Sequence, residues 1–371
     1  MDDIDILDVL VVYSASMATS ASVSDGESKH PFLLTSKQAD YNVSYSYLLQ
    51  NCEQNGMKAG FTTSADIIGP GTCKNYWTSS SGKWKKVASS AQSFHIFDKI
   101  SPVSLARTAE RQLLLSDPTI IPFNDAELFL TFCDKLRTFK KLPEYAIPTV
   151  GLSTISYKAI ASAIAKLNKL VAKARFSDDF SKKYVLKDRY GAGGNHVYQI
   201  RTSFAKTIYT IMVQNPTVEF VLQPFLLFDQ GFEHNSQRAS TDIRLLFHHN
   251  ELFQCYLRMA KADDFRCNEH QGGQLVYIAI SDVPVLIHTI AEKIVKKINK
   301  PNALFALDFA VSNAGRIYLV EGNIGPGIDW DATKAVNEKK SKQLIRRIVK
   351  EFVERKNFNY LIKSTDAGAL H

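Results

Sequence analysis

The chain has 371 residues, too many for one ordinary hydrophobic core, so two or three domains or lobes are expected. Its composition, with 45% hydrophobic and 22% charged residues, is that of a globular protein. No stretch approaches the roughly 18 apolar residues that span a membrane, and the net charge of +8 fits a protein that handles an anionic ligand.

Much of the positive charge lies in "EKKSKQLIRRIVKEFVERK", residues 338–356. Apolar residues recur in this segment at helical spacing, which predicts an amphipathic helix docked on a core with a solvated basic face. These residues are Leu344, Ile345, Ile348, Val349, Phe352 and Val353. A nucleic-acid-binding patch is the alternative, but no aromatic residues alternate with the basic ones, so nucleic acid is not an expected partner.

The N-terminal sequence "MDDIDILDVLVVYS" is acidic before its apolar run. A secretory signal begins with positive charge, so none is expected. Five cysteines are scattered without a CxxC pair, which favours a reducing compartment over a disulfide framework or a zinc site. We therefore expect a cytoplasmic protein without a membrane partner, and a homo-oligomer is left open.

The first part of the chain alternates apolar strands with polar connections. "DVLVVYS" (8–14) and "SFHIFDKI" (93–100) are predicted as buried strands. The Ser-, Gly- and Lys-rich stretch between them contains "YWTSSSGKWKKV", a candidate hairpin with a Ser-Gly turn. A helical pattern covers residues 125–140, and "IPTV" then begins an extended segment.

The rest of the chain combines helices with antiparallel strands. Ser156 is a candidate cap for the helix "YKAIASAIAKLNKLVAKARF", and "PVLIHTIAEKIVKKINK" predicts an amphipathic helix. "KKYVLKDRYGAGGNHVYQI" predicts a strand, a glycine-rich loop and a strand, and "VEFVLQPFLLF" predicts a buried strand. One hairpin turns at His249-Asn250, and "ALFALDFAVSNAGRIYLVEGN" forms another. The fold class is therefore α/β or α+β with substantial antiparallel sheet.

The last hairpin carries two acidic residues and an amide. If its loop has two or four residues, Asp308 lies directly opposite Glu321, and Asn323 shares the face of Glu321. Like charges opposite each other on a sheet repel, and a cation such as Mg²⁺, which prefers oxygen ligands, would offset the repulsion. Two alternatives stay open: each acid pairs with a separate basic residue, or a three-residue loop puts the two acids on opposite faces.

A glycine-rich loop follows the apolar strand that ends at Lys187. In "DRYGAGGNHV", Gly191, Gly193 and Gly194 would let backbone N–H groups approach phosphate groups, and the lysine would reach them as a point charge. The spacing matches neither the Walker pattern nor the dinucleotide fingerprint. A glycine-rich hairpin turn is an equally good interpretation of this segment alone.

Arginines occupy apolar strands in "DIRLLFHHNELFQCYLRMAKADDFRCNEHQGG". A buried guanidinium such as that of Arg244 or Arg258 needs an anionic partner. We interpret Arg258 and Arg266 as a clamp for phosphate or carboxylate groups, because the guanidinium fork suits both. Pairing of these arginines with Asp242 or Asp263 is the alternative.

Together these segments resemble the ATP-grasp superfamily, nearest the RimK-like ligases that join glutamate to an amine, and are also similar to enzymes of the glutathione synthetase type. The likeness runs from about Phe97 to Gly327. Four blocks carry it: "DKLRTFKKLPEYAIPTV", "YVLKDRYGAGGNHV", "DIRLLFHHNELFQCYLRMAKADDFRCNEHQGG" and "ALDFAVSNAGRIYLVEGNIGPG". The third and fourth blocks are long and specific, whereas the first two are each weak alone.

The resemblance implies a fold and a division of the chain. Two α+β subdomains would grip ATP after an N-terminal Rossmann-like α/β domain. The expected parts are an N-terminal domain (1–125), a subdomain with the glycine-rich loop (126–210), a subdomain with the metal site (211–356) and a tail (357–371).

The resemblance also implies site residues. Arg258 would bind the transferred phosphate and the intermediate, with Arg244 as a second catalytic residue. Mg²⁺, usually as two ions and with Mn²⁺ as an alternative, would be held by Asp308, Glu321 and Asn323. The residues implied to bind ATP are Lys135, Lys187, Gly191, Gly193, Gly194, Gln223, Phe225, Leu226, Asp242, Arg266 and Asn268.

Several positions depart from the family's pattern. Pro224 stands where an acidic residue is common beside adenine, and His196 stands where a small or apolar residue is familiar. The stretch 227–241 is longer than expected, and "IGPG" replaces a turn of small residues. The first 90 residues or so resemble the usual preceding domain only loosely.

The activity implied by the resemblance is that of an ATP-dependent carboxylate–amine ligase. The γ-phosphoryl group would pass to a substrate carboxylate, and a small-molecule, peptide or protein amine would attack the acyl phosphate, giving an amide, ADP and phosphate. Two other classes stay open: an ATP-binding regulatory module without chemistry, and a kinase-like phosphotransferase.

Overall fold

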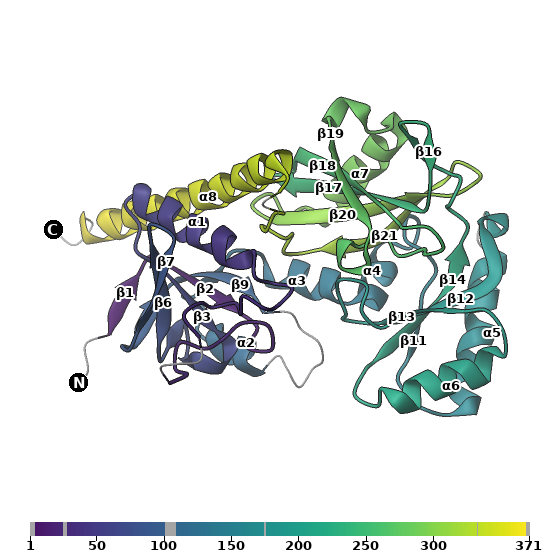
Figure 1. Ribbon diagram of the computed structural model, residues 1–371, viewed down its shortest axis with the longest axis horizontal. Helices are drawn as coiled ribbons and strands as arrows, with labels where there is room; N and C mark the ends of the chain where they lie inside the picture. Colours follow the sequence, from purple (N-terminus) through teal and green to yellow (C-terminus); the bar gives the residue numbers. More distant parts are fainter. Residues whose placement is uncertain (1–3, 25–27, 101–108, 174–175, 332, 369–371) are drawn as a thin grey trace. The chain divides into compact units, whose positions relative to one another are not determined.

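The structure is a computed structural model that describes residues 4–24, 28–100, 109–173, 176–331 and 333–368 (Figure 1). The chain forms two compact units. The first contains the N-terminal part of the chain up to Phe123 and the C-terminal part from Gly327, and the second contains residues 124–326. A membrane-crossing helix is absent from the described ranges, where none combines sufficient length with a sufficiently apolar sequence.

The first unit is built on a six-stranded sheet with the order β10-β9-β2-β3-β6-β7. The apolar sequence of β2 is completely buried, as predicted, and α1 (Tyr41–Gln54) connects it to its parallel neighbour β3. The strands are β2 (Val9–Tyr13), β3 (Ala59–Thr63), β6 (Tyr76–Ser80), β7 (Lys83–Val87), β9 (His95–Lys99) and β10 (Ile121–Pro122). Strands β10, β9, β2 and β3 are parallel to one another, whereas β6 and β7 join the sheet in antiparallel fashion. The parallel part with its crossover helix confirms the expected Rossmann-like character of the N-terminal region.

A second, four-stranded sheet of this unit has the order β1-β8-β5-β4. Its strands are β1 (Asp5–Leu7), β4 (Ile67–Gly69), β5 (Thr72–Cys73) and β8 (Ala91–Ser93), and the short helix α2 (Ala109–Leu114) lies beside β4. The predicted Ser-Gly hairpin is formed by β6 and β7, with Ser81 and Gly82 at φ values of 49° and 80°. These positive φ values are those of a tight hairpin turn.

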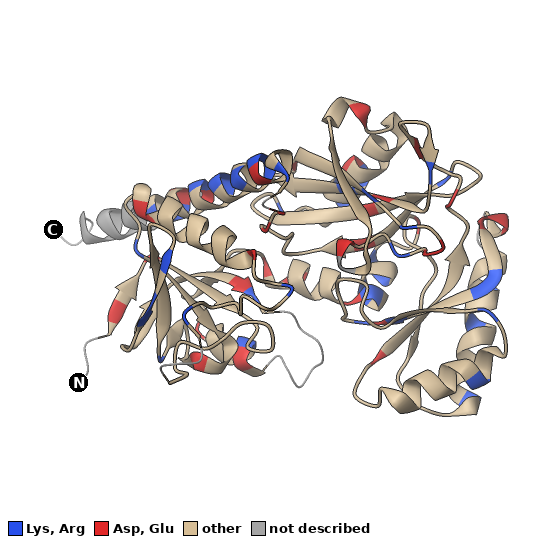
Figure 2. Cartoon of the chain, in the orientation of Figure 1, with Lys and Arg blue, Asp and Glu red and all other residues tan. Residues whose placement is uncertain are grey.

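The basic C-terminal segment forms helix α8 (Ala335–Gly368). Its apolar residues from Leu344 to Phe352 are buried against α1 and the sheet, where the Phe352 ring contacts those of Phe97 and Phe123. Lys and Arg residues lie along the helix (Figure 2), and several pair with acids one turn away. The predicted amphipathic helix is therefore confirmed, and it continues into the segment expected as a tail.

The second unit contains two larger sheets and a two-stranded one within its described residues, and the first of the larger sheets has the order β11-β14-β12-β13. Helices α5 (Tyr157–Lys173) and α6 (Phe204–Gln214) pack their apolar residues on it. The predicted cap is present, because the Ser156 hydroxyl accepts from the Ala159 N–H at 3.2 Å. The strands are β11 (Val150–Leu152), β12 (Phe180–Asp188), β13 (Val197–Ile200) and β14 (Phe220–Leu226).

The other sheet of this unit has the order β19-β18-β17-β20-β21 and is antiparallel. Alternate residues of its strands, such as Ile243, Leu245 and Phe309, form an apolar core with α3 (Ala126–Cys133) and α7 (Val285–Ile298). The opposite face is polar. The strands are β17 (Thr241–His248), β18 (Glu251–Met259), β19 (Gln274–Ile278), β20 (Leu304–Val311) and β21 (Ile317–Asn323).

The helical pattern predicted over residues 125–140 is two helices, α3 and α4 (Lys135–Lys141), not one. Asp134 separates them because its backbone is extended and its carboxylate accepts from the N–H groups of Leu136 and Arg137. Its carboxylate also binds the Arg189 guanidinium at 2.6 and 2.8 Å. The break therefore fixes Lys135 at the start of α4, beside the glycine-rich loop.

The long connection 227–241 contains a two-stranded hairpin, β15 (Glu233–His234) and β16 (Gln237–Arg238). It is tied to the turn between β20 and β21, because Asn313 exchanges hydrogen bonds with the Gln230 N–H and the Asp229 carboxylate at 2.9 Å each.

Both long hairpins of the antiparallel sheet contain a one-residue bulge. In β17–β18 the tight turn at His249-Asn250 sets one register, and Phe253 is an extra residue that shifts it between Leu246 and Phe247. In β20–β21 the loop has three residues, because Ser312 N–H donates to the Arg316 carbonyl. Here Val320 is the extra residue. Each bulge moves the residues beyond it to the other face of the sheet.

The predicted pairing of Asp308 with Glu321 is confirmed, but for a different reason. The three-residue loop alone would have placed Glu321 on the apolar face, which was the alternative left open above. The bulge at Val320 restores the pairing and returns Glu321 to the polar face.

Candidate active site

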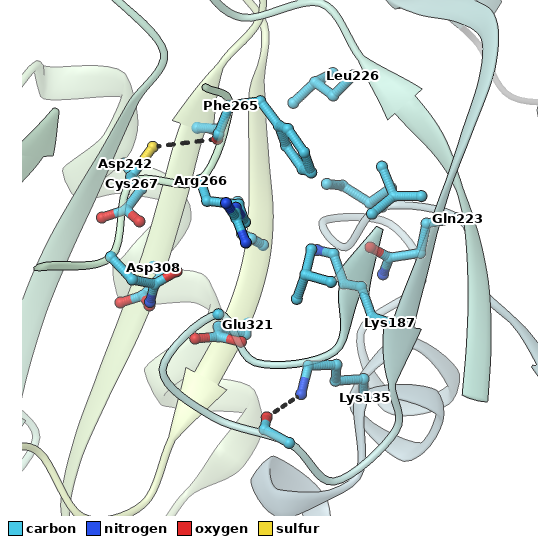
Figure 3. Close-up of a pocket in the computed structure, with 18 of the residues that line it drawn as sticks. Lys135, Lys187, Gln223, Leu226, Asp242, Phe265, Arg266, Cys267, Asp308 and Glu321 are labelled. Carbon is cyan, nitrogen blue, oxygen red and sulfur yellow. Dashed lines mark hydrogen bonds between the residues drawn. The ribbon is translucent and has the colours of Figure 1, made fainter. Parts of the chain in front are cut away.

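A cavity that encloses about 100 Å³ of water-accessible space, and is open to solvent at its mouth, lies between the two sheets of the second unit (Figure 3). Strands β12 and β14 and the glycine-rich loop form one wall, and β17, β18, β20 and β21 form the other.

Most of the residues predicted as a site line this cavity. Arg244 and Asn323 do not, but both hydrogen-bond to Asp308, which does. The predicted residues in the lining are Lys135, Lys187, Gly191, Gly193, Gly194, Gln223, Phe225, Leu226, Asp242, Arg258, Arg266, Asn268, Asp308 and Glu321. Their individual roles stay predictions.

The polar face of the antiparallel sheet carries an alternating chain of buried charges. Arg258 binds Asp242 through two contacts of 2.7 and 2.8 Å and reaches Asp308 at 2.7 Å. Arg244 binds both oxygens of Asp308 at 2.6 and 2.5 Å. All four side chains are nearly inaccessible to solvent, so each charge depends on its neighbours.

The strand register builds this chain. Asp242 on β17 lies opposite Arg258 on β18, and Arg244 on β17 lies opposite Asp308 on β20. Pairing of Arg258 with Asp242 was an open alternative to an anion clamp, and the structure contains that pair. The clamp residue Arg266 likewise binds Asp264, at 2.9 Å.

The two acids predicted as metal ligands have different surroundings. Burial alone would raise the pKa of the Asp308 carboxyl, but Arg244 and Arg258 hold it at about 2. Glu321 is more exposed, at 23%, and its Oε1 lies 3.8 Å from the nearest Arg244 nitrogen. Asn323 donates to Asp308 at 3.0 Å and lies 3.5 Å from Glu321.

This donor set fits a hard cation. Glu321 keeps its lone pairs nearly free, and Oδ1 of Asp308 accepts a hydrogen bond only from Arg244 among the described residues. The Asn323 amide contributes a further oxygen. Mg²⁺ takes oxygen ligands of this kind, usually from one or two carboxylates. Asp308 is thus a partner of the two arginines and also a candidate metal ligand. Pairing with basic residues and metal binding, which the sequence offered as alternatives, are therefore compatible at this residue.

Two lysines lie at one end of the cavity. The Lys135 ammonium donates to the Gly191 carbonyl at 2.5 Å and so holds the glycine-rich loop. Burial lowers the pKa of Lys187 to about 8, the nearby Glu321 charge opposes this shift, and Lys135 adds to it. Two cations beside backbone N–H groups of a glycine loop form a site suited to phosphate groups.

The glycine-rich loop is packed closely against residues 268–271. A Cβ on Gly194, whose φ is +76°, would lie 2.9 Å from both the Asn268 Oδ1 and the Gln271 Cγ. Gln271 also donates to the Gly193 carbonyl at 3.3 Å. Another residue at position 194 would be strained by the positive φ, and its Cβ would force the Asn268 and Gln271 side chains to shift.

The opposite end of the cavity is apolar. Residues of both walls form a small cluster there, and the Phe225 and Phe265 rings meet edge to face at 5.4 Å. The cluster residues that line the cavity are Ile147, Leu226, Phe228, Ala310 and Val320. The register of β12 shifts between Phe180 and Tyr184, so Phe225 has no directly paired residue on that strand. An apolar slot beside a strand position that lacks a paired residue suits a planar ring with a polar edge.

Several lining residues were missed by the sequence analysis. Ile147, Phe265 and Cys267 are examples, and Gln271 contacts the loop without lining the cavity. Phe265 and Cys267 flank Arg266 in "DFRCNE", which is part of a block quoted above. Their position next to a predicted site residue could therefore have indicated that they line the cavity. For Ile147 we see no signal, because its place follows from the packing of one subdomain on the other.

Asp308→Ala should destabilise the second unit by about 3–5 kcal/mol, because it leaves two buried guanidinium groups short of a partner. Urea unfolding followed by circular dichroism measures this, since all three tryptophans, Trp77, Trp84 and Trp330, lie in the first unit. Asp264→Ala is the control: its partner Arg266 is 31% exposed, so a change of about 1 kcal/mol or less is expected. Equal effects of the two variants would contradict the structural role of Asp308.

Binding of a nucleoside triphosphate should weaken as pH rises through about 8, because Lys187 loses its charge there. The folded pKa lies below the usual lysine value, so the ammonium is present below about pH 8 and absent above it. Calorimetric titration at several pH values measures the effect. Lys187→Arg keeps its charge at all these values and should flatten the profile. An unchanged profile in this variant would assign the pH dependence to another group.

No protein-family model matches the sequence, and no curated protein does either. Solved structures do. D-alanyl-alanine synthetase A from Vibrio cholerae O1 matches with a TM-score of 0.58 and 13% identity, covering 95% of this chain and 99% of that one. D-cycloserine synthetase DcsG matches at 0.55 and 15% identity, covering 94% and 99%.

A RimK-domain ATP-grasp protein from Sphaerobacter thermophilus matches with a TM-score of 0.52 and 12% identity, covering 93% of this chain and 99% of that one. At these identities the likeness concerns the fold, and it extends over nearly the whole of each chain. The resemblance indicated by the sequence blocks is therefore confirmed at the level of the fold: this chain has the ATP-grasp fold.

Proposed function

We propose that the protein is an ATP-dependent carboxylate–amine ligase that works through an acyl phosphate. One observation carries the proposal. A single cavity combines an apolar slot, a lysine-lined glycine loop and the partly exposed Glu321 beside the buried Asp308. These are the features needed to hold a base, its phosphates and a phosphate-bound cation. Solved structures with this fold that are named as synthetases also support it.

In this proposal the apolar slot holds adenine and the opposite end of the cavity holds the phosphates. Phe265 and Leu226 cover the ring, and backbone groups near Phe225 face its edge. Lys135 and Lys187 neutralise phosphate charge. Charge-assisted hydrogen bonds of this kind contribute roughly 1.5–3 kcal/mol each, so a few of them offset much of the cost of desolvating the phosphates.

Glu321, Asp308 and Asn323 would hold Mg²⁺, which supplies charge neutralisation at the phosphates when bound. The Arg244 and Arg258 pairs keep Asp308 ionised and fixed in place. Glu321 is the ligand with free oxygens, and so it is the residue on which metal binding depends most. Mn²⁺, which takes similar ligands, is an alternative ion.

The reaction then needs positioning more than a protein nucleophile. An oxygen of the substrate carboxylate attacks the γ-phosphorus, the bond to the bridging oxygen breaks, and ADP leaves. The amine nitrogen attacks the carbonyl carbon of the acyl phosphate, phosphate leaves, and the nitrogen loses a proton. Arg258, whose Nη1 makes no hydrogen bond within the described residues, stabilises the transferred phosphoryl group.

The glycine-rich loop would exclude water from the acyl phosphate. Its contacts with Asn268 and Gln271 join it to the opposite wall of the cavity. Such closure prevents hydrolysis of a reactive intermediate before the amine arrives. We place the reaction in the cytoplasm, which supplies ATP and keeps the five free thiols reduced.

The test is ADP release in the presence of panels of carboxylic acids and of amines, including amino acids and peptides. We expect release to require one acid and one amine and to match amide formation mole for mole. A stable phosphorylated product would identify a phosphotransferase instead. Nucleotide binding without any turnover would identify a binding module.

Glu321→Gln should abolish turnover, with a loss of at least about a hundredfold, because it removes the negative charge of the freest metal ligand. Its fold should survive, since Glu321 is partly exposed and makes no short ion pair among the described residues. Unfolding and nucleotide binding without metal are the controls. Wild-type rates in this variant would falsify the metal assignment.

A further inference from the structure

The glycine-rich loop has a tip that lines the cavity and a base that does not. The tip is formed by residues 191–195, all of which line the cavity, whereas Arg189 and Tyr190 are outside its lining. The base is closed by a backbone hydrogen bond, in which the Asp188 N–H donates to the His196 carbonyl at 3.0 Å. Arg189 therefore lies where the loop leaves β12, next to the site but outside it.

Two acids use all three guanidinium nitrogens of Arg189. Its Nε and Nη2 donate to the Asp134 carboxylate at 2.8 and 2.6 Å, and its Nη1 donates to the Glu219 carboxylate at 2.9 Å. The Arg189 N–H donates to the Glu219 carbonyl at 2.8 Å, and the Arg189 carbonyl accepts from the Lys135 N–H at 3.1 Å. A planar fork of donors suits this arrangement, whereas a lysine ammonium is a compact point charge.

The two acids belong to different parts of the second unit. Asp134 caps α4, whose first residue is Lys135, and Glu219 immediately precedes β14. Arg189 thus joins the start of α4, the base of the loop and the start of a cavity wall. Burial alone would raise the pKa of the Asp134 carboxyl, but hydrogen bonding and charge from Arg189 lower it below its usual value. The acid is therefore ionised at neutral pH.

Stability is a weak explanation for this cluster. The side chains of Arg189, Asp134 and Glu219 are 25%, 12% and 32% exposed, and ion pairs in contact with solvent add little to the free energy of unfolding. A bidentate pair does fix direction as well as distance. What the cluster provides is therefore the relative position of the segments that it joins.

Lys135 is the cavity residue on which this position acts. Its N–H is bound by the Arg189 carbonyl, and its ammonium donates to the Gly191 carbonyl at 2.5 Å (Figure 3). Backbone and side chain of this lysine are thus both held by the loop, one at its base and one at its tip. A shift of α4 against the base would move the ammonium relative to the tip, and small misplacements of such groups are costly.

We propose that Arg189, held by Asp134 and Glu219, is a positioning residue that fixes Lys135 and the tip of the glycine-rich loop for binding of the nucleotide phosphates. It acts through Lys135 and does not touch the ligand. The inference rests on the proposed nucleotide site, and it assigns part of the affinity for phosphate groups to a cluster outside the cavity lining.

The test is Arg189→Lys, which keeps the charge and removes the fork. Dissociation constants for ATP and for adenosine are measured by calorimetry on the full chain. ATP should bind roughly tenfold more weakly, because one charge-assisted hydrogen bond contributes about that factor. Adenosine, which lacks phosphates, should bind as it does to the wild-type protein. Equal losses for both ligands would indicate a general structural role and overturn the inference, as would an unchanged affinity for ATP.

A double-mutant cycle with ATP alone tests the route through Lys135. In a Lys135→Ala background, Arg189→Lys should change the dissociation constant by less than about twofold, because the side chain that Arg189 positions is gone. The same loss in both backgrounds would show that Arg189 does not act through Lys135. This cycle needs no measurement with adenosine.

Arg238→Lys is the matched control. Arg238 also binds a glutamate, Glu233, at 2.8 Å, but it lies in the exposed hairpin β15–β16 and does not line the cavity. Its replacement should leave the affinities for ATP and adenosine unchanged. A loss of ATP affinity equal to that of Arg189→Lys would contradict a specific role of Arg189.

Asp134→Asn keeps the test decisive if Arg189→Lys does not fold. The amide oxygen can still cap α4, but the neutral group holds Arg189 less firmly, so ATP should bind roughly threefold to tenfold more weakly. Wild-type affinity for ATP in this variant would overturn the inference. If the wild-type protein binds no ATP, the inference and the proposed function both fail, whereas ATP binding that is insensitive to these variants removes the inference alone.

Discussion

The ion-pair chain Asp242–Arg258–Asp308–Arg244 is the interaction on which the polar face of the antiparallel sheet depends. Four buried charges on three neighbouring strands are tolerable only because they alternate in sign and hydrogen-bond to one another. Such a chain contributes little net stability compared with an apolar core, but it permits one arrangement of the three strands. A slip of any strand by one residue would send a charge into the apolar core behind the sheet.

The two bulges make this arrangement possible. If Phe253 were paired in a regular ladder instead of forming a bulge, Asp242 would face Leu257 and Arg258 would point into the core. If Val320 were paired in the same regular way, it would take the place opposite Asp308 and Glu321 would leave the cavity. In each hairpin the turn sets one strand register, but the charged residues on the polar face require a register shifted by one residue. One extra residue in the second strand of each hairpin, β18 and β21, reconciles them, which is how bulges commonly re-aim side chains beside a site.

Much of the fold could be predicted from the sequence, because the apolar periodicity is strong. The His249-Asn250 and Ser81-Gly82 turns can be predicted from the sequence, because Asn and Gly are common in tight turns with positive φ. The bulges have no comparable signal, since Phe253 and Val320 are ordinary strand residues. For this reason the pairing of Asp308 with Glu321 was predicted correctly, although the loop length used to predict it was wrong. The sequence also could not decide whether Arg258 pairs with Asp242 or with a ligand.

The two acids of the last hairpin show why residue type alone cannot assign roles in this site. Both oxygens of Asp308 accept hydrogen bonds from arginines, so its negative charge is largely neutralised within the protein. Glu321, directly opposite on the next strand, keeps its charge for a ligand and lies near Lys187. A cation drawn to Glu321 would therefore meet a carboxylate that is already fixed in place and partly neutralised. Asp308 thus provides a rigid position, and Glu321 provides a negative charge that is available to a ligand. This division suits a site that must bind metal-bound phosphates and also release them.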